Sequence, residues 1–359
     1  MSKYSNYTVQ PDFSFAGGLP PAPYKLHESV VQRLDSEYVD FFNANMTNGS
    51  SFLYTHRTPL KDIRKGGNVM PGQTPLSKVA KIFDIAIPRV YTKGSTETIP
   101  ARVFVPEGER PTDGWPLFIW YHGGGWVLGN ISTENSFCTK VASMSNCVVI
   151  SVDYRLAPED PFPAGVDDAF ESVLYGFEVA PKELGINNKK IAIGGSSAGG
   201  NLTAVVTHKF ANSKLSSKFP PVVFQVLVVP VTDNTATPEN KVSWKENEFT
   251  PQLPAEKMIW YRYLYLPNAE DVTNPEASPL FYSDESFAKV PPCFIAAAGC
   301  DVLRTEAEEY YQKLQKNGIK SIIRVYPGVP HPVMAMDAVL SKGVQLIKDV
   351  TDALSEAYK

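Results

Sequence analysis

The pentad Gly195-Ser196-Ser197-Ala198-Gly199 places a serine between two glycines directly after an apolar run. Where such a pentad leaves a strand and enters a helix, its central residue lies on a sharp, strained turn that exposes the side chain. The glycines lack a Cβ that would collide across the turn, and the first amides of the helix have no partner within it. The pentad therefore predicts a strand, a sharp turn and a helix, with Ser197 as a nucleophile. The alternative is an ordinary strand-to-helix turn, and the pentad alone does not decide between them.

Short β-rich runs alternate with helical patterns from about residue 81 onward. This alternation is typical of βαβ units and predicts an α/β fold, with a mostly parallel central sheet flanked by helices. The predicted strands cover 82–90, 101–105, 117–121, 147–153, 190–194, 222–229, 293–297 and 321–326. The predicted helices that follow the middle and later strands cover 134–145, 164–180, 198–213, 305–317 and 335–358.

Two segments do not follow this alternation. Residues 1–75 contain a helical pattern of apolar residues, and residues 233–280 contain an aromatic helical run that starts after a proline. We expect 1–75 to form an N-terminal cap segment and 233–280 a cap insertion. Residues 76–232 and 281–359 then form the α/β core.

The composition excludes several classes of function. Hydrophobic residues make up 43% of the 359 residues and charged residues 20%, which indicates a globular protein rather than a disordered one. The net charge of −4 provides no basic surface for phosphates, so we expect no nucleic-acid partner. The four cysteines have no metal-ligand spacing. We therefore expect reduced thiols, no metal and no cofactor.

The expected cellular location rests on two sequence patterns, those of a secretory signal and of a membrane span. The N-terminal residues are polar and have no apolar core of the kind found in secretory signals. The apolar run 222–231 is interrupted by Gln225, and no run reaches the length of a membrane span. We expect a cytoplasmic protein without a membrane span.

A serine nucleophile needs a base, and the chain has five histidines. His27 and His56 lie in the N-terminal segment, while His208 lies about three turns down the helix after the pentad and points away from it. His122 belongs to a glycine run with a different predicted role. His331 follows the last predicted strand, in the kind of loop that carries active-site groups in α/β proteins. An exposed loop histidine without a catalytic role is the alternative.

The base in turn needs a carboxylate to orient it, and the chain order of α/β hydrolytic folds places this acid between Ser197 and His331. Asp301 directly follows the apolar strand pattern 293–299. The other acids in this interval lie on polar, cap-like segments: Glu246, Glu248, Glu256, Asp271 and Asp284. Asp301 is also well placed to cap the helix after it, and the two roles can coexist.

The run His122-Gly123-Gly124-Gly125-Trp126 follows a predicted strand. Its glycines allow the backbone to bend so that amides face a reacting carbonyl, as in an oxyanion hole. A phosphate-binding loop is the competing interpretation. The chain has neither of the glycine patterns that bind phosphates at the expected place, which disfavours a nucleotide site.

These motifs together resemble the hormone-sensitive lipase group of α/β-hydrolase esterases. The resembling blocks are His122–Trp126, Asp153–Glu159, Gly195–Asn201, and finally Asp301 and His331. They cover about residues 80–359. The resemblance implies an α/β-hydrolase fold with a helical cap formed by the two cap segments. It further implies that Arg155 pairs with Glu159 beneath the site, and it allows a homodimer.

For the site, the resemblance implies Ser197 as nucleophile, His331 as general base and acid, and Asp301 as its orienting partner. It implies that the amides of Gly124, Gly125 and Ala198 hold the oxyanion. We therefore expect a serine carboxylesterase that acts on a small-molecule ester.

Aromatic residues near the oxyanion loop and in the cap segments favour an apolar pocket of modest size, suited to short- or medium-chain esters. The residues that we expect on its wall are Trp126, Phe42, Trp260 and Tyr261. Two alternatives stay open: a non-catalytic small-molecule receptor of the same fold, or an amidase, lactonase or acyltransferase that uses the same triad.

Overall fold

The computed structural model describes residues 20, 22–49, 53–65 and 72–359. Its central sheet has eight strands in the order β1-β2-β4-β3-β5-β6-β7-β8. Only β1 with β2 and β2 with β4 run antiparallel among these neighbours, and the other pairs are parallel. The strands are β1 (Lys81–Pro88), β2 (Thr98–Val105), β3 (Trp115–Tyr121), β4 (Val148–Val152), β5 (Ile186–Ser196), β6 (Phe224–Val228), β7 (Cys293–Ala298) and β8 (Ser321–Tyr326). The predicted α/β class with a mostly parallel sheet is confirmed.

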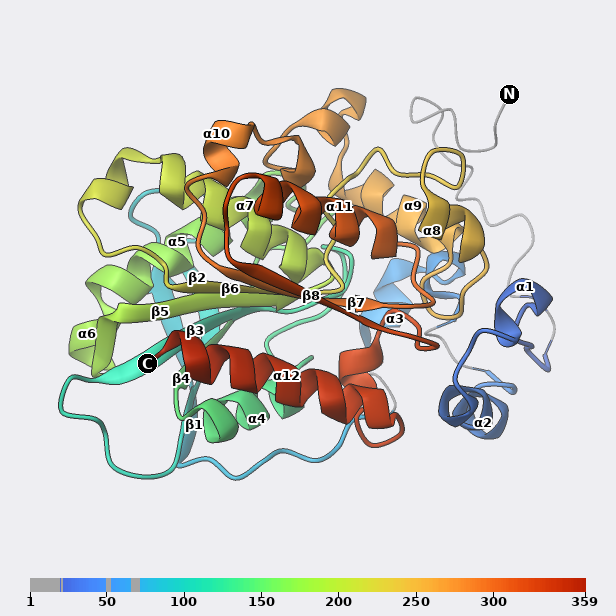
Figure 1. The fold of residues 1–359 in the computed structure, drawn as a ribbon, viewed down its shortest axis with the longest axis horizontal. Coiled ribbons are helices and arrows are strands. Elements are labelled where there is room, and N and C mark those ends of the chain that lie inside the picture. Colours follow the sequence, from blue (N-terminus) through green and yellow to red (C-terminus); the bar gives the residue numbers. More distant parts are fainter. Residues whose placement is uncertain (1–19, 21, 50–52, 66–71) are drawn as a thin grey trace.

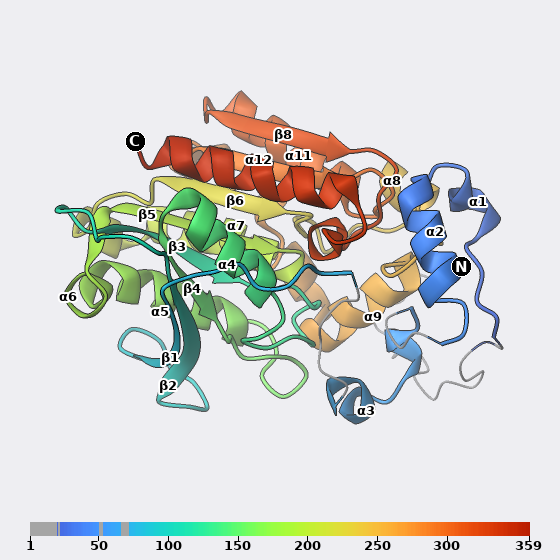
Figure 2. The same ribbon diagram turned by 90° about the horizontal axis from the view of Figure 1, so that it is seen from below.

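Helices cover both faces of this sheet (Figure 1). One face carries α4 (Asn135–Ser145) and α12 (Ser341–Ala357), which Figure 2 shows side by side. The other face carries α5 (Ala164–Glu178), α7 (Ala198–Asn212) and α11 (Arg304–Lys316). Strands β4 and β7 are buried along their whole length, as expected of a sheet covered on both sides.

A second group of helices gathers at the end of the molecule toward which the parallel strands point (Figures 1 and 2). Asp35 starts one of them by accepting a hydrogen bond from the amide of Glu37, and Pro254 immediately precedes another. These elements are α1 (Glu28–Val31), α2 (Ser36–Asn45), η1 (Thr55–Arg57), α3 (Leu60–Lys65), α8 (Val242–Glu246) and α9 (Ala255–Tyr265). Other short helices are α6 (Ala180–Glu183), η2 (Lys214–Ser217), η3 (Ala269–Thr273), η4 (Pro279–Phe281) and α10 (Asp284–Phe287).

The proposed domain boundaries stay a prediction. Within the predicted N-terminal cap segment, residues 1–19, 21, 50–52 and 66–71 lie outside the described residues. Across the part of the chain that is described, no helix is both long enough and apolar enough to cross a bilayer.

The last helix differs from its prediction. It begins at Ser341 rather than at 335, because Val333–Met336 forms a separate short helix, η5. Within η5, Ala335 has a non-helical backbone (φ −86°, ψ 15°). His331 lies in the loop between β8 and η5.

Candidate active site

The turn between β5 and α7 has the predicted sharp geometry. Ser197 lies between the two elements with φ +54° and ψ −116°, outside the usual regions for a residue with a side chain. Its amide donates to the carbonyl of Val228 at 2.8 Å, which fixes the turn against β6. A Cβ at Gly195 would lie 2.2 Å from the carbonyl oxygen of Gly199. The close approach of these two backbone segments therefore requires glycine.

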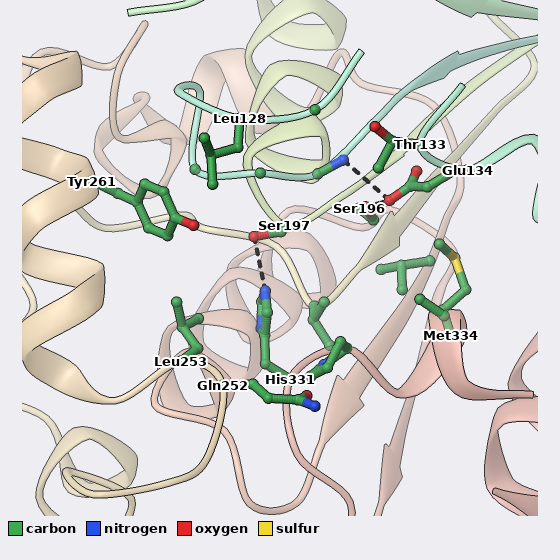
Figure 3. Close-up of a pocket in the computed structure, with 18 of the residues that line it drawn as sticks. Leu128, Thr133, Glu134, Ser196, Ser197, Gln252, Leu253, Tyr261, His331 and Met334 are labelled. Atoms are coloured by element: carbon green, nitrogen blue, oxygen red, sulfur yellow. Dashed lines mark hydrogen bonds between the residues drawn. The ribbon is translucent and has the colours of Figure 1, made fainter. Parts of the chain in front are cut away.

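The structure brings the three predicted side chains into one hydrogen-bonded chain. Nδ1 of His331 lies 2.7 Å from Oδ2 of Asp301, and its Nε2 lies 2.8 Å from Oγ of Ser197 (Figure 3). Asp301 is 1% exposed, and its other oxygen accepts the amide of Leu303 at 3.1 Å. The carboxylate thus bonds both the imidazole and the start of the next helix. With Nδ1–H donating to Asp301, Nε2 is left to accept the proton of the serine hydroxyl.

The glycine loop after β3 lies against the serine turn. Gly123, Gly124 and Gly125 line the same pocket as Ser197, and Ala198 is the first residue of α7. Among the described residues, the amides of Gly124, Gly125 and Ala198 donate to no protein acceptor. Amides in this state, close to a nucleophile, can stabilise a developing oxyanion.

Glu134 is a site residue that the sequence analysis missed. Its Oε1 accepts the amide of Gly123 at 3.2 Å and the hydroxyl of Ser196 at 2.5 Å (Figure 3), and its Oε2 accepts Nε1 of Trp120 at 2.5 Å. Burial raises the pKa of this carboxyl, and the hydrogen bonds from Ser196 and Trp120 oppose the rise. Glu134 therefore links the glycine loop to the serine turn. The sequence marked it only as the first residue of a helix.

The pocket around Ser197 has a volume of about 150 Å³. Leu253 and Tyr261, from the segment that carries α8 and α9, lie on one side of Ser197, and Met334 lies on the other (Figure 3). The ring of Tyr261 packs against the glycine loop, because a Cβ at Gly125 would lie 2.2 Å from its Cγ. The full lining comprises Thr55, Gln73, Gly123–125, Leu128, Gly129, Thr133, Glu134, Ser196, Ser197, Val228, Val229, Gln252, Leu253, Lys257, Tyr261, His331, Pro332, Met334 and Ala335.

A sequence model of the α/β-hydrolase fold family matches residues 118–335, which span the glycine loop, the serine turn and the histidine loop. The chain is an α/β-hydrolase of the hormone-sensitive lipase group.

Relatives of this α/β-hydrolase include an AB hydrolase superfamily protein of Schizosaccharomyces pombe, 56% identical over 93% of this chain and 96% of that protein. The carboxylic ester hydrolase LipN of Mycobacterium tuberculosis is 36% identical over 70% of this chain and 63% of its own. Among solved structures, a hyperthermophilic esterase from Pyrobaculum calidifontis matches with a TM-score of 0.73 and 30% identity, over 86% of this chain and 97% of that one.

Of the four aromatic residues predicted on the pocket wall, the α/β-hydrolase places only Tyr261 there. Trp126 is 1% exposed and stacks on Tyr265 with 4.2 Å between ring centroids. Phe42 lines a separate cavity, and Trp260 is buried among core residues. Neighbouring residues on a helix point about 100° apart, and on α9 it is Tyr261 rather than Trp260 that lines the pocket.

The implied pair between Arg155 and Glu159 is wrong. Arg155 of the α/β-hydrolase binds the buried carboxylate of Asp168 at 2.8 Å. Glu159 binds Arg64 of α3, also at 2.8 Å. Arg64 further donates to the carbonyl of Val127, just after the glycine loop. Both arginines have partners from elsewhere in the fold, which the local sequence block could not reveal.

His122 and His208 hydrogen-bond groups outside the chain of Asp301, His331 and Ser197. His122 donates through Nδ1 to the carbonyl of Gly123, and burial lowers its pKa to about 4. His208 lies between the hydroxyls of Ser286 and Tyr310. Within the described ranges of the α/β-hydrolase, no cluster of His, Cys, Asp and Glu side chains could hold a metal ion.

Lys257 adds a titratable group to the pocket wall. Burial lowers the pKa of its ammonium group to about 7.

Proposed function

We propose that this protein is a serine carboxylesterase that hydrolyses short- to medium-chain esters through an acyl-enzyme on Ser197. The observation that supports this most strongly is the continuous chain of hydrogen bonds from Asp301 through His331 to Ser197. These three side chains lie at a pocket, beside backbone amides that have no acceptor among the described residues. The named relatives, which include carboxylic ester hydrolases, support the same reaction class.

In this mechanism, Nε2 of His331 takes the hydroxyl proton as Oγ of Ser197 attacks the ester carbonyl. Asp301 keeps the imidazole in the required tautomer and stabilises its positive charge. The amides of Gly124, Gly125 and Ala198 stabilise the oxyanion. His331 then gives the proton to the departing alcohol, and water attacks the acyl-enzyme by the reverse sequence of proton transfers.

The size of the pocket supports the preference for short chains. Cavities of about 150 Å³ take up one benzene ring, which corresponds to roughly six carbon atoms. Leucine, valine and methionine side chains form much of the wall and suit an alkyl group.

Replacing the nucleophile tests the proposal. We expect Ser197→Ala to lower kcat for p-nitrophenyl butyrate by roughly 10⁴- to 10⁶-fold, as the loss of a triad nucleophile does. The circular dichroism spectrum and the unfolding midpoint stay close to those of the unmodified protein. Ser217→Ala, which changes an exposed serine in η2, is the matched control and keeps full activity.

Near-normal hydrolysis by folded Ser197→Ala would overturn the proposal. A parallel assay with p-nitroanilides separates an esterase from an amidase. Ligand binding without a burst of p-nitrophenol would instead indicate the receptor alternative.

A further inference from the structure

Gln252 has a backbone conformation that a residue with a side chain rarely adopts. It lies in the loop between α8 and α9 with φ +71°, in the left-handed region. Such strain persists only where the surrounding structure fixes it, often at ligand sites. The side chain is nevertheless only 4% exposed. The loop thus holds a polar residue inside the protein at a conformational cost.

The loop is tied directly to the strand end that carries Asp301. Asn247 donates through Nδ2 to the carbonyl of Asp301 at 2.9 Å, and Thr250 donates through Oγ1 to the carbonyl of Cys300 at 2.5 Å. Both bonds are buried. They hold this loop against the strand end that carries Asp301, and Gln252 from the same loop lines the pocket.

The carboxamide itself is poorly paired. Oε1 of Gln252 is buried and has no hydrogen-bond partner among the described residues. Its Nε2 contacts Sδ of Met46 at 3.8 Å, and a thioether is a weak acceptor. A buried amide left in this state is unfavourable, whereas a ligand that hydrogen-bonds it removes the penalty. Figure 3 shows this side chain on the pocket wall near His331.

Gln252 also lines a second cavity of about 520 Å³, between the N-terminal helices and the loop before α9. Polar and charged side chains contribute to its wall, among them His27, Tyr54, Arg57 and Glu256. The pocket at Ser197 has mainly apolar walls beyond the catalytic groups. Gln252 is thus shared by two cavities, of which the second has the more polar wall.

We propose that Gln252 is a specificity-determining residue that hydrogen-bonds a hydroxyl group of the substrate. The preferred substrates are then esters with a hydroxyl in the part that extends from Ser197 toward the second cavity. A hydroxyl both donates and accepts, so it satisfies either orientation of the carboxamide. This inference rests on the proposed esterase function.

Matched ester pairs test the inference and identify the part of the substrate involved. Ethyl 3-hydroxybutyrate against ethyl butyrate places the hydroxyl in the acyl part, and 2-hydroxyethyl butyrate against propyl butyrate places it in the alcohol part. We expect the unmodified protein to favour the hydroxylated member of one pair by about five-fold in kcat/KM, the worth of one neutral hydrogen bond.

Gln252→Leu removes the carboxamide and brings this ratio to about one. Gln252→Asn is the second variant, because asparagine tolerates the left-handed backbone but is one methylene too short for the same bond. Gln73→Leu is the matched control. Its amide lines the same pocket but already donates to the carbonyl of Thr133, and this variant keeps the ratio.

The inference is overturned if the unmodified protein shows no preference in either pair, or if both Gln252 variants retain the preference. In these cases the plain esters are still hydrolysed in a Ser197-dependent manner, and only the role of Gln252 fails. If none of the four esters is hydrolysed, the esterase proposal fails and the inference fails with it.

Discussion

Two regions of the molecule contribute different kinds of residue to the same pocket. One is the row of loops at the carboxyl ends of the strands, called here the sheet edge, and the other is the group of helices that covers these loops. The sheet edge contributes Ser197, Asp301 and His331, which hydrogen-bond one another and are fixed by adjoining backbone. The segment with α8 and α9 contributes Leu253 and the ring of Tyr261, which meet the pocket through apolar surface, and also the polar side chain of Gln252. This difference separates two properties of the enzyme. Substitutions at the sheet edge are expected to lower the rate for every substrate alike. Substitutions in the covering helices and loops are expected to alter which substrate is preferred.

Among the substitutions that test this difference between the two regions, Asp301→Asn is expected to cause the largest loss of activity. The amide preserves the shape of the side chain but favours the wrong imidazole tautomer, which lowers kcat by about 10⁴-fold in such triads. The loss should be equal for acetate, butyrate and hexanoate esters of p-nitrophenol. Asp284→Asn, at an exposed ion pair with Lys316, is the control and keeps normal activity. A loss of kcat that depends on acyl length would contradict the view that the sheet edge affects every substrate alike.

Glu134→Gln should have an intermediate effect. Glu134 receives hydrogen bonds from the amide of Gly123 and from Nε1 of Trp120 on different oxygens, so either orientation of a glutamine amide places N–H against N–H. A displaced glycine loop should reduce kcat by about ten- to hundred-fold for all esters. Steady-state kinetics with the p-nitrophenyl series measures the effect, with the exposed Glu178→Gln as control. Unchanged kcat would show that the loop is held without this carboxylate.

The smallest expected effect comes from Leu253→Ala, which enlarges the pocket from above. Each additional methylene that the larger pocket buries is worth about 0.8 kcal/mol, or roughly four-fold in kcat/KM. The optimum should move to longer chains in a p-nitrophenyl ester series or in a series of alkyl acetates, while Ser197 stays essential. Leu264→Ala, in α9 but outside the pocket lining, leaves the optimum unchanged. If neither optimum moves, Leu253 does not set chain length.

The sequence predicted the fold class and the three clustered side chains because both depend on local signals. The elbow needs glycines at fixed spacing, and Asp301 and His331 each follow an apolar strand, so the topology brings them together. Glu134 and Gln252 have no such signal. Their positions depend on which distant backbone groups the fold places beside them.

The aromatic residues show a different limit of sequence reasoning. Hydrophobic periodicity indicates that a residue such as Trp126 is buried, but it does not tell a core contact from a pocket wall. Trp126 is buried against Tyr265, a residue far away in the chain. The predicted pair between Arg155 and Glu159 was wrong because the partner of Arg155 lies outside the local sequence block. Arg155 binds Asp168 on α5 instead.

The contact between the Tyr261 ring and Gly125 limits how independently the two parts of the pocket can be altered. A library that varies position 261 to widen the substrate range also removes the surface on which the glycine loop rests. Gains in scope at this position should therefore come with losses in turnover number. Leu253 and Gln252, which line the pocket from the loop before α9, are the better starting points for engineering new selectivity.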